Sequence, residues 1–194
     1  MPHKLIVDAA TGLITGVRQV LSPNFDSRPA NTVPELLVVH GISLPPGEFG
    51  GPWIDRMFTG TLPADAHPFF RDLAAARLSA HALIRRDGQI VQYVPFGERA
   101  WHAGVSAYCG RSACNDFSIG IELEGSEQTP YTDAQYGQLS ALTAALLSAY
   151  PSLSVDRIVG HGDIAPDRKS DPWGTFDWPR FRKTLADVVR PGVA

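Results

Sequence analysis

The sequence has little cysteine, no block of like charges and no long apolar run at its beginning. Its 194 residues include two cysteines, Cys109 and Cys114, and carry a formal net charge of -3 at pH 7. A small net charge without basic blocks argues against nucleic acid or an anionic membrane as the main partner. The two cysteines lack the second pair that a structural zinc knuckle needs, and we expect them to be reduced. These absences leave a small molecule or a polymer as the expected substrate.

The first residues do not have the pattern of a targeting segment. The apolar stretch after Lys4 is interrupted by Asp8, and Gly12 and Thr15 follow soon after. Neither a signal-peptide core nor a transmembrane span fits this pattern. We therefore expect a cytoplasmic protein.

The length fits one domain, residues 1–194, which can bury a hydrophobic core without disulfides or a structural metal. A metal in this chain is therefore expected to serve chemistry. There is no repeat, low-complexity tract or linker. Residues 1–30 contain Pro23 and Pro29 and few periodic apolar positions, which predicts a loosely structured lead-in.

Apolar patterns predict a mixed central β-sheet flanked by α-helices, an α/β fold. Expected strands cover residues 36–40, 80–86, 90–94, 118–124 and 157–160. Expected helices cover residues 52–58, 68–76, 133–150 and 179–189. Asp87-Gly88 predicts a hairpin between the second and third strands, and Thr132 with Gln135 predicts a capping box for the third helix.

Two histidines occupy the same context at distant places. His40 ends the apolar strand 36–40, and His161 directly follows the strand 157–160. Either one alone is more often a hydrogen-bonded structural histidine, but the repetition favours metal ligation. Two histidines and one carboxylate, with one position left open, are typical of a catalytic zinc.

The third ligand is a choice among three carboxylates in the loop after His161. Asp163 and Asp167 have ordinary roles as turn or helix-capping residues. Asp171 precedes Pro172, which favours an extended backbone, and we prefer Asp171 as the ligand. Lys169 points to the same side in an extended segment and can stabilise an oxyanion, although an exposed lysine is the default interpretation.

The strand 118–124 places Glu122 and Glu124 on one face and its apolar residues on the other. If that face points to the metal, one glutamate is a candidate general base. If it points to solvent, both are the polar side of an edge strand. The pattern alone does not choose between these alternatives.

Other candidate residues have less specific patterns. For His81 and His102, hydrogen bonding within or beside the pocket is favoured over metal ligation, and His67 is expected at a helix entry. Trp101 and Phe49 offer apolar faces to a sugar or a peptide, with core packing equally expected for Phe49.

Several motifs together resemble the AmpD type of 1,6-anhydro-N-acetylmuramoyl-L-alanine amidase. These motifs are ISLPPGEFGG at 42–51, RAWHAG at 99–104, CNDFSIGIE at 114–122 and DIAP at 163–166. The resemblance runs over about residues 23–185. It implies the zinc amidase fold shared with phage amidase-type lysozymes and peptidoglycan recognition proteins.

The resemblance implies a site and a reaction. It places Zn²⁺ on His40, His161 and Asp171, the catalytic glutamate at Glu122 and an oxyanion-stabilising lysine at Lys169. The implied reaction cleaves the amide between anhydro-muramic acid and L-alanine of the stem peptide during cytoplasmic recycling of cell-wall fragments. The implied substrate is thus a small anhydro-muropeptide. We further expect substrate contacts from Trp101, His102 and Arg77, and a monomer.

Three positions depart from the family pattern without removing a ligand. Gly41 stands where asparagine is usual, Gly162 where cysteine is common, and Trp173-Gly174 where a glycine-proline pair is found. One alternative function is a non-catalytic muropeptide receptor, which predicts the loss of a ligand or of Glu122. Another is a broad amidase acting on intact murein outside the cytoplasm, against which the absence of an export signal argues.

Overall fold

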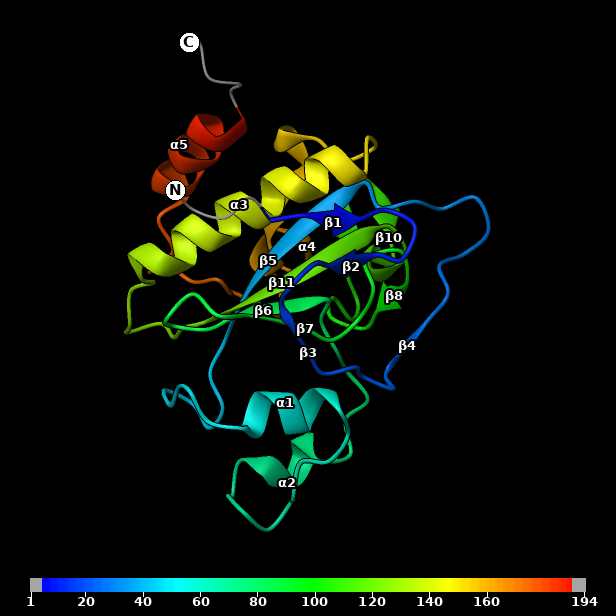
Figure 1. The fold of residues 1–194 in the computed structure, drawn as a ribbon. Coiled ribbons are helices and arrows are strands. Elements are labelled where there is room, and N and C mark those ends of the chain that lie inside the picture. Colours follow the sequence, from blue (N-terminus) through cyan, green and yellow to red (C-terminus); the bar gives the residue numbers. More distant parts are fainter. Residues whose placement is uncertain (1–4, 190–194) are drawn as a thin grey trace.

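The computed structural model describes residues 5–189 and contains a six-stranded mixed sheet (Figure 1). The strand order is β12-β5-β11-β6-β7-β3, in which β12, β5, β11 and β6 are parallel, β7 is antiparallel to β6, and β3 is parallel to β7. The bounds are β3 (Arg18–Gln19), β5 (Leu36–Ile42), β6 (Ala82–Ile84), β7 (Ile90–Gln92), β11 (Ser118–Glu124) and β12 (Ile158–Gly160). The predicted mixed sheet is confirmed.

Shorter elements surround this sheet. Three two-stranded ladders pair β1 (Val7–Asp8) with β2 (Leu13–Ile14), β4 (Phe25–Asp26) with β8 (Arg99–Ala100), and β9 (Ala107–Tyr108) with β10 (Arg111–Ser112). The α-helices are α1 (Trp53–Phe58), α2 (Phe70–Leu73), α3 (Asp133–Ala149), α4 (His161–Ile164) and α5 (Trp178–Val189).

The two faces of the sheet have different roles. Alternate residues such as Val39 and Ile121 join a large core with Leu142 of α3 and Phe181 of α5, and Figure 1 shows both helices on this side. The opposite face carries the polar members of β5 and β11. Beyond it, α1 and α2 pack on Leu83 and other residues of β6 and β7 in a second core. The polar face therefore carries the side chains of the sheet that are capable of catalysis or metal binding.

Two local predictions are confirmed in detail. Thr132 Oγ1 accepts the Gln135 N–H at 3.2 Å, and Gln135 Oε1 accepts the Thr132 N–H at 3.0 Å, so the capping box of α3 is complete. Such a cap stabilises a helix by about 1 kcal/mol. The hairpin between β6 and β7 turns at Asp87-Gly88, where Gly88 has a φ of 88°. A positive φ is readily adopted only by glycine.

Three predictions differ from the structure. The lead-in is not loose over residues 5–30, because it forms β1 to β4 and β3 extends the central sheet. The helix predicted at 68–76 is a single turn, α2, in which only Phe70 is buried, so little packing supports a longer helix. The segment after residue 160, predicted as a loop, starts with the short helix α4.

Cys109 is exposed, Cys114 is buried, and both carry free thiols. Within residues 5–189, none of the helices has the length and apolar character needed to cross a bilayer.

Candidate metal centre and active-site cleft

Three neighbouring parallel strands bring the candidate residues into one row. In the register of β5 with β12, Val39 lies opposite Gly160, so the next residues, His40 and His161, are neighbours. In the register of β5 with β11, His40 lies opposite Glu122. Because the carboxyl ends of parallel strands meet at one edge, ligand sites gather there. Both histidines follow an apolar strand segment in the sequence, and the pairing of β5 with β12 brings them together.

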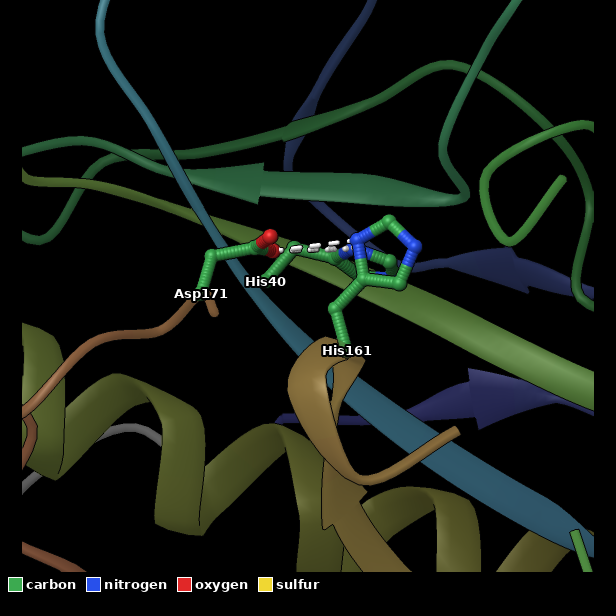
Figure 2. Close-up of side chains that lie close together, drawn as sticks. All are labelled: His40, His161 and Asp171. Carbon is green, nitrogen blue, oxygen red and sulfur yellow. Dashed lines mark hydrogen bonds and ion pairs between the residues drawn. The ribbon is translucent and has the colours of Figure 1, made fainter. Parts of the chain in front are cut away.

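His40, His161 and Asp171 form a compact buried group (Figure 2). The two Nδ1 atoms of the histidines are 3.0 Å apart. Asp171 Oδ2 lies 3.2 Å from His161 Nδ1 and 3.4 Å from His40 Nδ1. Ligands bound to a tetrahedral zinc at 2.0–2.2 Å are separated by about 3.3 Å. The three atoms therefore have the spacing of three zinc ligands.

The electrostatics of this group also suit a metal. Burial lowers the pKa of His40 to about 4, which keeps its ring neutral at pH 7. Burial alone would raise the pKa of Asp171. Its hydrogen bonds with His161 and His40 have a larger, opposite effect and hold the pKa well below its usual value. Neutral imidazole and ionised carboxylate are the forms that bind metal.

Glu122 adds a carboxylate without a hydrogen bond at one oxygen. Its side chain is buried, and Oε2 has no hydrogen-bond partner among the described residues. Burial, followed by the charge of Asp171, raises the pKa of Glu122 well above its usual value. A carboxyl group with a raised pKa and an oxygen without a protein partner among the described residues is suited to accept and return a proton.

Glu124, two residues further along β11, is placed differently. Its carboxylate accepts hydrogen bonds from the backbone N–H of Gly50 and of Arg86, and from the Arg85 guanidinium, at 2.8–3.2 Å. It therefore ties the loop before α1 to the sheet. The two glutamates share a face, as predicted, but only Glu122 lines the cleft that contains the candidate ligands.

That cleft has a volume of about 360 Å³, within the range of small-molecule sites. It opens over the row of candidate residues. Its wall includes Ser43, Leu44, Phe69, Trp101, Lys169 and Trp173. Lys169 is exposed, and its positive charge opposes the rise in the pKa of Glu122. The cleft thus combines a buried acid, a candidate metal group, an ammonium and aromatic faces.

The N-acetylmuramoyl-L-alanine amidase family matches residues 30–174. The chain belongs to this family. It is 64% identical over 171 residues to the 1,6-anhydro-N-acetylmuramyl-L-alanine amidase AmpD of Escherichia coli strain K12, covering 88% of this chain and 93% of that protein. It is 54% identical over 180 residues to AmpD of Haemophilus influenzae, with coverages of 93% and 98%.

The fold of this amidase agrees with solved AmpD. A crystal structure of a selenomethionine AmpD derivative matches with a TM-score of 0.89 and 59% identity, over 93% of this chain and 99% of that one. The resemblance and the α/β fold class expected from the sequence are confirmed.

The other residues that the sequence singled out in this amidase make specific contacts with the protein. Arg77 is exposed and lies over the Trp101 ring, 5.1 Å from its centroid. Trp101 Nε1–H donates to Asp26 at 3.0 Å, which fixes the indole. His81 is buried, and its Nδ1 accepts the Gly120 N–H at 3.0 Å. His67 Nδ1 accepts the Phe69 N–H before α2, as a helix-entry residue does.

A larger hollow of about 680 Å³ lies beside Glu124. Phe49 lines this hollow and not the cleft of the candidate ligands, and the Arg86 guanidinium lies 5.0 Å from its ring centroid. Arg85 in this hollow is paired with Asp55 at 3.1 Å and with Glu124 at 3.2 Å. None of the three candidate ligands lines this hollow. Its Arg86 guanidinium donates to the backbone carbonyls of Glu124 and Pro130 at 3.1 and 2.7 Å.

Two of the departures noted in the sequence meet in space. A Cβ atom on Gly41 would overlap the Trp173 indole and the Tyr131 hydroxyl. Trp173 has a φ of 61°, a left-handed conformation that bulky residues rarely adopt, and its N–H donates to Ser170 O at 3.0 Å. The Trp173 ring therefore forms the part of the cleft wall where a side chain at position 41 would lie.

Proposed function

We propose that this amidase hydrolyses, with zinc, the amide bond between 1,6-anhydro-N-acetylmuramic acid and L-alanine of the stem peptide. The observation that carries the proposal is the buried group of His40, His161 and Asp171 beside Glu122, in a chain up to 64% identical to AmpD amidases. We place the activity in cytoplasmic recycling of cell-wall fragments and expect a monomer that acts on a small substrate.

His40, His161 and Asp171 would hold the metal through two nitrogens and one oxygen. Bound zinc supplies Lewis-acid chemistry, activating water near pH 7 and polarising a carbonyl. Within residues 5–189 no group hydrogen-bonds to Oε2 of Glu122. This supports the arrangement, since a buried acceptor beside the metal group would be suited to take a proton from water.

The protein residues have separate roles in this proposal. Glu122 takes the proton of the attacking water and returns it to the alanine nitrogen as the amide bond breaks. Lys169 Nζ stabilises the negative charge that develops on the carbonyl oxygen. Trp101, with Arg77 stacked on its ring, offers a surface for the sugar or the peptide.

The proposal is tested by mass spectrometry of products from two substrates, anhydro-muropeptide and intact murein, incubated in parallel. We expect anhydro-muramic acid and free peptide from the first, about one zinc per chain by elemental analysis, and loss of activity after chelation that zinc restores. A protein that cleaves only intact murein would support a broad murein amidase. Binding of anhydro-muropeptide without cleavage would support the receptor function.

Lys169→Met should lower the turnover number by about two to three orders of magnitude, because it removes a group that meets the oxyanion only in the transition state. Zinc content and the Michaelis constant should change little. Steady-state kinetics with elemental analysis check this result. An unchanged turnover number with a raised Michaelis constant would assign Lys169 to substrate binding instead. Lys183, on α5, is not among the residues that line the cleft, and Lys183→Met is the matched control.

A further inference from the structure

His40 uses both of its ring nitrogens. Its Nδ1 faces His161 and Asp171, on the side of the proposed metal. Its Nε2, on the opposite side of the ring, lies 2.9 Å from Nδ1 of His102. The orientation of His40 therefore depends on whether His102 Nδ1 can accept a hydrogen bond from His40 Nε2.

With a metal on the Nδ1 side of His40, a single placement of protons satisfies this chain of contacts. For Nδ1 of a neutral His40 to offer its lone pair to a metal, the ring proton must reside on Nε2. Nε2–H then donates to His102 Nδ1, which must carry a lone pair. The proton of a neutral His102 is consequently on its own Nε2, which lies 3.1 Å from Ser118 Oγ, and the hydroxyl oxygen accepts it.

The surrounding residues hold the His102 ring in this place. Asn115 Oδ1 accepts the backbone N–H groups of His102 and Ala103 at 3.1 and 2.8 Å. A Cβ atom on Gly120 would lie within 2.7 Å of His102 ring atoms, so only glycine leaves room for the ring on β11. The hydrogen bonds to the backbone of His102 and the space at Gly120 on β11 together fix the position of this imidazole.

We propose that His102 is a positioning residue, which fixes the tautomer and the orientation of the metal ligand His40 through the contact of His40 Nε2 with His102 Nδ1. The inference rests on the proposed zinc function. Ligating histidines usually donate their second N–H to a carboxylate, a backbone carbonyl or water. His161 follows that pattern, since its Nε2 lies 3.4 Å from Ala103 O, whereas His40 donates to a second imidazole.

This role differs from the substrate contact predicted for His102 from the sequence. Both of its nitrogens are engaged with protein atoms, so a substrate in the cleft meets the ring without a free donor or acceptor. A positioning role predicts a change in metal affinity. A substrate-binding role predicts a change in the Michaelis constant alone.

Two amide variants separate the roles because their polar atoms replace different ring nitrogens. Asparagine places its Oδ1 where Nδ1 of His102 lies, so His102→Asn keeps an acceptor for His40. His102→Gln places its amide near the Nε2 position and loses that acceptor. We expect a zinc dissociation constant within about 3-fold of wild type for His102→Asn and raised about 10- to 100-fold for His102→Gln, the range seen when such partners are removed.

The dissociation constants are measured by competition with a chromophoric chelator, with circular dichroism melts to show that each variant is folded. Long-range ¹H–¹⁵N NMR of the zinc-free protein reports which nitrogen of His40 is protonated. We expect Nε2–H in wild type and His102→Asn, and a mixture of tautomers in His102→Gln. This spectrum requires no metal, so it tests His102 even if wild type binds no zinc, which would contradict the proposed function alone.

Equal zinc affinities and equal His40 tautomers in all three folded proteins would overturn the inference. A raised Michaelis constant in both variants, with zinc affinity unchanged, would also overturn it and assign His102 to the substrate.

Discussion

Glu122→Gln is expected to keep its zinc and to lower the turnover number by about two to four orders of magnitude. The amide has the shape of the carboxylate but cannot accept a proton from water. The effect should be large because the Glu122 carboxylate lies in the row with His40 and has no hydrogen bond at Oε2 among residues 5–189. Steady-state kinetics and elemental analysis on the same preparation check both parts.

Glu124→Gln is the matched control on the same face of β11. It breaks an ion pair with Arg85 and weakens the contacts to the backbone N–H groups of Gly50 and Arg86. We expect a loss of about 2 kcal/mol in the free energy of unfolding and a much smaller loss of turnover. If the two variants behaved alike, or if Glu124→Gln alone abolished turnover, the assignment of the general base would be wrong.

Asp171→Ala is expected to abolish measurable turnover through loss of the metal. Asp171 Oδ2 lies within 3.4 Å of both histidine Nδ1 atoms, so its removal takes away one ligand and the negative charge of the group. The zinc dissociation constant should rise more than about 100-fold, beyond the cost of losing an outer partner. Chelator competition measures it.

The other two carboxylates of the same segment serve as controls. Asp167 is exposed, and Asp167→Ala should leave zinc binding and turnover unchanged. Asp163 Oδ2 accepts the Gly160 N–H at 2.7 Å, so Asp163→Ala should loosen the start of α4 while zinc remains bound. Loss of zinc from Asp167→Ala, with retention in Asp171→Ala, would show that the third ligand is misassigned.

Much of the fold could be predicted because its main elements have local signals. The strands β5 and β11 have apolar patterns of strand length, and α3 has both a capping box and an apolar stripe through Leu139 and Leu142. Two-residue strands such as β3 have no period to detect, and backbone pairing with β7 places β3 at the sheet edge. This is why the lead-in was not predicted as part of the sheet.

The candidate site was predictable in its residue types and unpredictable in its contacts. Histidines after apolar strands indicated ligands, but no local pattern gives the register that brings Glu122 opposite His40. Similarly, the contact between His102 and His40 joins residues 62 positions apart and depends on the space left by Gly120. Such long-range pairings are decided by tertiary packing.

The overlap between position 41 and the Trp173 indole restricts the order in which this cleft can evolve. A side chain at position 41 has no room while the indole and the Tyr131 hydroxyl are in place, whereas either of these two groups can be lost first without any clash. Position 41 is therefore epistatic with positions 131 and 173, and a path toward a polar residue at 41 must first make room at both. A mutational scan in this background would score Gly41 as intolerant for steric reasons, and that score would carry no information about substrate recognition.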